Sequence, residues 1–258
     1  MDAPGGSAGP LVQAEAEAER VTTAARGAGV TAPLVGGLAI FVRCPSAHRP
    51  PLQRPYKDID LVTSKGMAQR LTVLLEELGY QPDKRFNALQ GGQRLFFWDA
   101  QNQRQLDVFI GKFEMSHNFD LRDRLAIDPT APTLPLADLL LTKMQVVEIN
   151  LKDMQDIAAL LQDHPLTRDE TGINLEYITG LTRNDWGLQH TLEKTAERLQ
   201  DPEILPRLRA PEPRYELVGQ LNTLVRAMQE APKSMAWKLR DKVGERKRWY
   251  ELPEEAQA

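Results

Sequence analysis

The stretch RPYKDIDLVTS, residues 54–64, places two acidic side chains, Asp58 and Asp60, inside a run that is otherwise typical of a β-strand. Because alternate side chains of a strand face the same side, both carboxylates lie on one face, and Ile59 and Leu61 lie on the other. Two neighbouring negative charges destabilise a strand unless a cation or water screens them. The stretch therefore predicts either a cation-binding site or a half-exposed sheet whose polar face meets water.

A third acid follows the same pattern further along the chain. Asp107 lies in RQLDVFIG, residues 104–111, between the apolar residues Leu106 and Val108. Three carboxylates from neighbouring strands form an oxygen-rich site of the kind that holds Mg²⁺ or Mn²⁺. Such a site would supply the charge balance that residues 54–64 lack, and a sheet with three solvent-facing acids stays the alternative.

The segments around these acids alternate between strand and helix patterns. An apolar run ends at Gly36-Gly37 and a helix-competent run follows, while the prolines of residues 45–55 exclude regular structure there. Further predicted elements are helices within 11–29, 65–80 and 134–164, the last with a break near Asn150, a strand at 56–63, and a hairpin at 93–111 that turns at Asp99–Gln103. This order predicts a small sheet flanked by helices, an α+β fold.

The chain changes character after Pro165. Residues 1–10 are rich in Gly, Pro, Ser and Ala and are expected to be unordered, and residues 11–165 carry the α+β pattern. Residues 166–258 contain three predicted helices, at 173–182, 185–200 and 214–231, and a basic segment at 233–248. The predicted organisation is a mixed domain followed by a helical C-terminal region.

Glycines and a lysine offer contacts for phosphate groups. At Gly36 and Gly37 the backbone can approach a phosphate closely, and the free N–H groups of the helix that follows point toward it. A plain turn is the alternative for this glycine pair. Lys143 lies among apolar residues of a predicted helix and either extends to solvent or neutralises a bound triphosphate. Asp153 and Asp156 share one helix face and either orient groups near Lys143 or form surface ion pairs.

The order of these motifs resembles the polymerase-β-like nucleotidyltransferase superfamily, and most closely the nucleotidyltransferases of abortive-infection toxin–antitoxin systems. The resemblance covers about residues 30–165 and rests on GG, KDIDLV, LDVFI and the helix LLLTKMQ…KDMQDI. It implies that Gly36 and Gly37 bind the phosphates of an NTP, that Asp58, Asp60 and Asp107 bind Mg²⁺, and that Lys143 and Asp156 serve the catalytic site. It also makes a cognate antitoxin a candidate partner, whose existence the sequence leaves open. Gly37 stands where many members have serine, and the loop between Gly37 and Asp58 is long and proline-rich.

Composition excludes several other classes of protein. The 258 residues are 41% hydrophobic and 26% charged, with a formal net charge of −4, so a globally basic nucleic-acid coat is absent. The single cysteine, Cys44, allows neither an intrachain disulfide nor a thiolate zinc site. No apolar run is long enough to span a membrane, and the first ten residues do not resemble a secretion signal. A cytoplasmic protein without membrane contact is the expectation.

The segment from Lys233 to Arg248 is locally basic despite the acidic total. Seven basic residues are interleaved there with Trp237, and Trp249 and Tyr250 follow directly. Such a segment can contact RNA phosphates and stack on bases, so it could present an RNA acceptor. The alternative is a solvated helix whose tryptophans dock on the rest of the protein.

Together these patterns predict an enzyme that moves a nucleoside monophosphate from an NTP to a hydroxyl group of RNA, protein or a small molecule, with Mg²⁺. The alternative is a non-catalytic protein of the same fold that binds a nucleotide or a partner.

Overall fold

The computed structural model describes residues 9–251, so residues 1–8 of the predicted unordered N-terminus lie outside the described residues. Pro10 is buried, and its carbonyl oxygen accepts a hydrogen bond from Asn102 Nδ2 at 3.1 Å. The chain forms two compact units. The first consists of Met1–Val42, Pro55–Phe113 and Phe119–Leu134, and the second of Arg43–Arg54, Glu114–Asn118 and Pro135–Ala258.

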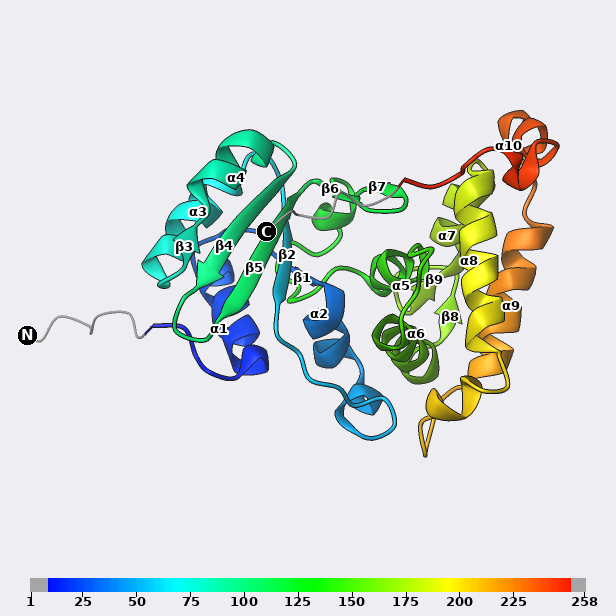
Figure 1. The fold of residues 1–258 in the computed structure, drawn as a ribbon, viewed down its shortest axis with the longest axis horizontal. Helices are drawn as coiled ribbons and strands as arrows, with labels where there is room; N and C mark the ends of the chain where they lie inside the picture. Colours follow the sequence, from blue (N-terminus) through cyan, green and yellow to red (C-terminus); the bar gives the residue numbers. More distant parts are fainter. Residues whose placement is uncertain (1–8, 252–258) are drawn as a thin grey trace, which may run out of the picture. The chain divides into compact units, whose positions relative to one another are not determined.

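A five-stranded mixed sheet forms the centre of the first unit (Figure 1). In spatial order its strands are β1 (Leu34–Val35), β2 (Ile59–Thr63), β5 (Arg104–Ile110), β4 (Arg94–Asp99) and β3 (Gln81–Pro82). β2 and β5 are parallel, and the other neighbouring pairs are antiparallel. The predicted α+β class and the hairpin of residues 93–111 are confirmed, since β4 and β5 are joined through the expected turn.

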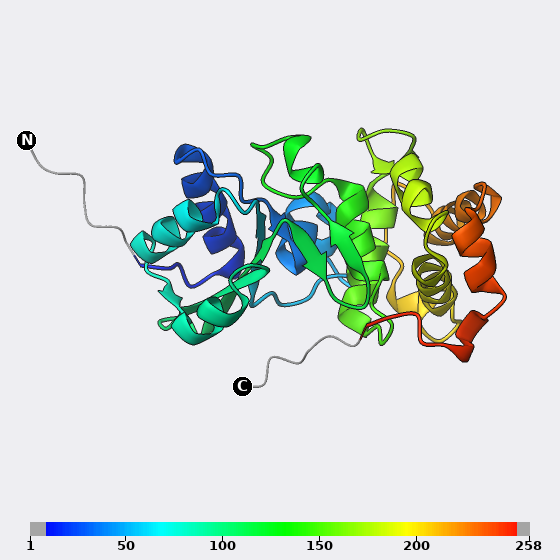
Figure 2. The ribbon, with the colours of Figure 1, turned by 90° about the horizontal axis from the view of Figure 1, so that it is seen from above.

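Four helices belong to this unit or begin in it: α1 (Ala14–Gly27), α2 (Gly36–Arg43), α3 (Ala68–Glu77) and α4 (Lys84–Gln90). α1 and α3 pack against each other (Figure 2). α3 turns Leu71 and Leu75, one helical turn apart, into the core, as its apolar spacing predicts. The short sheet β6 (Lys112–Glu114) and β7 (Asn118–Asp120) and the 3₁₀ turn η2 (Arg124–Ala126) follow β5.

Helices dominate the second unit. They are α5 (Leu136–Met144), α6 (Leu151–Asp163), α7 (Leu175–Thr182), α8 (Trp186–Leu199), α9 (Leu217–Glu230) and α10 (Met235–Asp241). α8 and α9 lie side by side, and α10 packs on α8 (Figure 1). Short elements complete the unit: η1 (Pro45–His48), β8 (Leu166–Thr167), β9 (Ile173–Asn174), η3 (Leu205–Arg207) and η4 (Gly244–Arg246).

Three details differ from the sequence-based expectations. β2 begins at Ile59, so Asp58 precedes the strand. The proline-rich stretch at 45–55 contains one 3₁₀ turn, Pro45–His48, because proline suits the first position of such a turn. α5 and α6, which the sequence grouped with residues 11–165, lie in the second unit, where they pack on each other and on α7, α8 and α9. In the described part of the chain, no helix combines the length and apolar character that crossing a membrane requires.

Candidate active site in the first unit

The register of the two central strands brings two predicted acids together. β2 and β5 are parallel, and Asp60 is the direct partner of Asp107 across the pair. Residues that are partners in register face the same side of a sheet, so both carboxylates lie on one face. Asp58 is two residues before Asp60 at the end of the chain segment that enters β2, and its side chain is exposed.

Asp107 is the most buried acid of this group, with a residue exposure of 5%. Burial raises the pKa of its carboxyl group above the ordinary value. Arg94 counteracts burial by donating a hydrogen bond from Nε to Asp107 Oδ1 at 2.7 Å, and the negative charge of Asp58 raises the pKa of Asp107 in turn. Asp58 is therefore close enough to Asp107 for the two charges to influence each other.

Arg94 had no assigned role in the sequence analysis. It lies on β4 opposite Phe109, two residues beyond Asp107 on the same face of β5, and its guanidinium carbon is 5.2 Å from the centroid of the Phe109 ring. The hairpin register contained this signal: with the turn at Asp99–Gln103, Arg94 pairs with Phe109, and its long side chain reaches the neighbouring acid.

Gly36 packs directly against Asp60. It ends the β1 segment and begins α2 with φ of +71°, in the region that residues with a Cβ rarely adopt. A Cβ added at this position would lie 2.3 Å from Asp60 Oδ2, closer than atoms can approach. The strand–glycine–helix order predicted for Gly36 and Gly37 is present, and no acidic residue lies in the first turn of α2. The N–H groups at the start of this helix thus begin beside a carboxylate of the candidate site.

The donor chemistry of the three acids suits a hard divalent cation, since all the ligand atoms would be carboxylate oxygens. Among residues 9–251, however, no group of three or more His, Cys, Asp and Glu side chains is arranged so that it could hold a metal ion. At Asp107, the guanidinium of Arg94 binds one carboxylate oxygen. Asp60 and Asp107 share a face and a register, whereas Asp58 precedes β2.

The two other predicted site residues lie in the second unit and contact each other. Lys143 Nζ lies 2.9 Å from Asp153 Oδ1 and 2.9 Å from Asp156 Oδ2. Burial lowers the pKa of Lys143, but the two aspartates outweigh it and the pKa is raised overall. Arg54 Nη2 binds Asp156 Oδ2 at 2.8 Å, an ion pair that the sequence analysis did not include. These four side chains form one charge-balanced cluster with two cations and two anions.

Comparisons with known proteins give a likeness among solved structures. No family model matches the sequence, and no curated protein matches it. Among solved structures, a STING-associated CdnE c-di-GMP synthase from Capnocytophaga granulosa is similar, with 14% sequence identity, a TM-score of 0.25, and coverage of 87% of this chain and 83% of that chain. Because this TM-score is low, the function of the present chain has to rest on its own residues.

Proposed function

We propose that the first unit transfers a nucleoside monophosphate from an NTP to a hydroxyl group with the help of Mg²⁺. Two contacts of Asp60 support the proposal best. Asp60 pairs directly with Asp107, and its carboxylate fills the space beside Gly36 that a Cβ would otherwise take. Strand acids beside the start of a glycine-initiated helix place ligands for a cation and N–H donors for phosphate within one small region.

In this proposal each group has a distinct task. Asp58, Asp60 and Asp107 would hold a cation, which would supply neutralisation of the charge on the triphosphate. Gly36 and Gly37 let the phosphates approach the N–H groups of α2. A bond forms between the acceptor oxygen and the α-phosphorus, the bond from that phosphorus to pyrophosphate breaks, and Asp107 accepts the proton that the hydroxyl group loses. Most of the rate gain comes from positioning and charge neutralisation.

The Asp60→Asn variant tests this assignment. It keeps the size of the side chain and removes the negative charge, so we expect Mg·NTP affinity to fall at least tenfold and transfer of labelled NMP to components of a cell extract to be lost. The matched control is Asp123→Asn, an exposed acid of the same unit, for which both quantities should stay within twofold. Circular dichroism and a thermal melt verify that each variant folds. If Asp60→Asn binds Mg·NTP as tightly as the unmodified protein and transfers as fast, the assignment is wrong.

A second candidate function is favoured by the ion pair between Arg94 and Asp107. A guanidinium bound to the third acid suits a protein that binds a nucleotide without turning it over. The Arg94→Ala variant separates the two candidates. For the enzyme, removing the competing cation from Asp107 should tighten Mg²⁺ binding severalfold in a calorimetric titration. For a non-catalytic protein, NTP binding should persist without Mg²⁺, no substrate should become labelled, and the variant should leave Mg²⁺ binding unchanged.

A further inference from the structure

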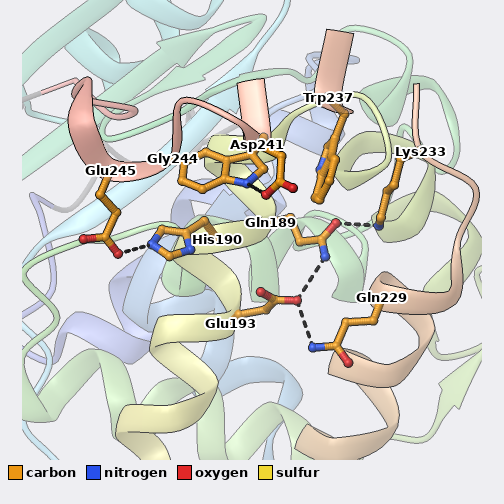
Figure 3. Close-up of a pocket in the computed structure, with 10 residues that line it drawn as sticks. Gln189, His190, Glu193, Gln229, Lys233, Trp237, Asp241, Gly244 and Glu245 are labelled. Atoms are coloured by element: carbon orange, nitrogen blue, oxygen red, sulfur yellow. Dashed lines mark hydrogen bonds and ion pairs between the residues drawn. The ribbon is translucent and has the colours of Figure 1, made fainter. Parts of the chain in front are cut away.

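A pocket of about 580 Å³ lies among α8, α9, α10 and η4 of the second unit (Figure 3). Its size falls in the range of about 300–1,000 Å³ typical of small-ligand sites. The residues that line it include an aromatic ring, Trp237, a carboxylate, Glu193, and the polar side chains of Gln189, Gln229 and Lys233. A pocket with one flat apolar wall and a few polar groups suits a planar, hydrogen-bonding ligand.

The carboxylate of Glu193 is held in a fixed orientation. Its Oε1 accepts hydrogen bonds from Gln189 Nε2 at 3.0 Å and Gln229 Nε2 at 3.3 Å (Figure 3). Gln189 is buried, and its own Oε1 accepts a hydrogen bond from Lys233 Nζ at 2.5 Å, which fixes which end of the amide faces Glu193. Both amide bonds go to Oε1, so Oε2 takes part in neither. The pocket thus presents an oriented acceptor for N–H donors.

Trp237 supplies the flat wall of the pocket. The ammonium group of Lys233 lies 5.2 Å from the centroid of its ring. The indole Nε1 is buried and has no hydrogen-bond partner among the described residues. This atom has no exposed surface, so a ligand in the pocket meets the face of the indole ring and not this donor. Trp186 differs, because its Nε1 donates to Asp241 Oδ1 at 2.7 Å and its ring stacks on His190.

The charged side chains that line the pocket are mostly acidic, whereas the exposed charged side chains of the adjoining segment are mostly basic. Three acids, Glu193, Asp241 and Glu245, line the pocket against a single lysine, Lys233, so a free phosphate group is repelled from the interior. The segment that forms this wall nevertheless carries five exposed cations: Lys238, Lys242, Arg246, Lys247 and Arg248. An anionic chain is attracted to this segment, and only an uncharged part of that chain can enter the pocket.

We propose that the pocket binds an unpaired guanine base of a single-stranded nucleic acid. Guanine offers two adjacent N–H donors, at N1 and at the exocyclic amine, to the Glu193 carboxylate. Its ring stacks on Trp237, and the phosphates of the strand contact the exposed cations of residues 238–248. The inference uses residues of the second unit alone, so it stands or falls separately from the proposed transferase activity.

Fluorescence anisotropy with the full chain and labelled eight-nucleotide oligomers tests the proposal. We expect an oligo-U with one central guanine to bind at least tenfold more tightly than oligo-U, and central adenine or cytosine to give less than half of that gain in binding free energy. RNA and DNA versions of each oligomer establish which strand is preferred. Asp60→Asn should bind all of them as the unmodified protein does, which separates this test from that of the transferase.

Three variants assign the parts of the site. Glu193→Gln should abolish the guanine preference and leave oligo-U binding within twofold, and Trp237→Leu should weaken binding of every oligomer about tenfold. Glu197→Gln, one turn further along α8 at an exposed position, is the matched control and should change nothing. Replacing Lys242 by Ala should weaken all sequences alike and lower the slope of log K against log salt by about 0.7.

Three outcomes would overturn the proposal. They are equal affinity of the unmodified protein for oligo-U with and without guanine, an undiminished guanine preference in Glu193→Gln, or Glu193-dependent binding of an arginine-rich peptide in place of the oligomers. The last result would assign the acidic lining to an organic cation.

Discussion

At the scale of single residues, the contact between Gly36 and Asp60 links the backbone to the candidate chemistry. Gly36 has a positive φ, and the space that a Cβ would fill is taken by the Asp60 carboxylate. Glycine is therefore required twice, once by the conformation and once by the close approach. The same residue that allows α2 to start here also determines where the Asp60 side chain can lie.

This double requirement predicts the effect of Gly36→Ala. The left-handed conformation alone costs about 1–2 kcal/mol for a residue with a Cβ. The Cβ must also displace Asp60, so we expect the free energy of unfolding to fall by about 1–3 kcal/mol and Mg²⁺ affinity to fall at least tenfold. Urea denaturation and calorimetry measure the two quantities.

Gly66→Ala is the matched control for this prediction. Gly66 is exposed in the same unit, and no atom lies within 4 Å of the position that its Cβ would take. Its variant should change stability by no more than about 0.5 kcal/mol. Equal effects of the two substitutions would show that the Gly36–Asp60 contact has no special role.

The acids could be placed on one face from the sequence, but their surroundings could not. Alternation along each strand puts Asp58 with Asp60, whereas the pairing of Asp60 with Asp107 depends on strand order, which a single sequence does not specify. Arg94 escaped notice because a long cation on a strand is usually a solvated residue. Its ion pair follows from the hairpin register and from the burial of Asp107, and burial is a property of the folded chain.

At the scale of elements, long apolar periodicities predicted the main helices, and weak local signals were missed. The break near Asn150 is confirmed, because Asn150 caps α6 by accepting a hydrogen bond from the N–H of Asp153 at 3.1 Å. α4 was not predicted, since it has no buried residue and hence no apolar stripe. Its one signal is the cap at Asp83, which accepts a hydrogen bond from Phe86 N. β1 and β3, with two residues each, exist only through their neighbours in the sheet.

The α6 cap provides a prediction at this scale. Asn150→Ala removes the acceptor of the Asp153 N–H, so we expect a loss of about 1 kcal/mol in the free energy of unfolding. The first turn of α6 also carries Asp153, a partner of Lys143, and loosening that turn should add to the loss. Urea denaturation measures it, with Lys152→Ala, an exposed position of the same turn, as control. Identical midpoints for the two variants would exclude a stabilising cap.

At the scale of the whole molecule, each unit contains its own ion pairs with at least one buried member. In the first, Arg104 and Asp99 form an ion pair at 2.7 Å with side-chain exposures of 2% and 0%. In the second, Lys143, Arg54, Asp153 and Asp156 balance one another. The resemblance suggested Lys143 for a triphosphate, and in the folded chain Lys143 pairs with Asp153 and Asp156. Spacing along a helix can identify Asp153 and Asp156 as neighbours, but the long-range partner Arg54, 102 residues before Asp156, is set only by the tertiary fold.

Two histidines of the second unit, the buried His117 and the half-buried His164, make stability depend on pH. His117 Nε2 lies 2.9 Å from Thr191 Oγ1, and His164 Nε2 lies 3.0 Å from the carbonyl oxygen of Arg43. Burial lowers the pKa of both imidazoles below the ordinary value. As the pH falls, the unfolded chain therefore binds protons at these positions before the folded chain does. The stability that the neutral rings contribute is present above pH about 6.5 and is lost as the pH falls toward the folded pKa values.

We expect the free energy of unfolding to fall below pH about 6.5 by up to about 1.4 kcal/mol per pH unit for each histidine. Urea denaturation at half-unit pH steps from 7.5 to about 5 measures this slope. His117→Gln should remove its share, because glutamine can bond Thr191 but does not titrate, and the double variant with His164→Gln should flatten the curve further. If the slope is the same in the double variant and the unmodified chain, protonating these imidazoles costs the folded protein nothing measurable. Other groups, the carboxylates foremost, would then govern the stability at acid pH.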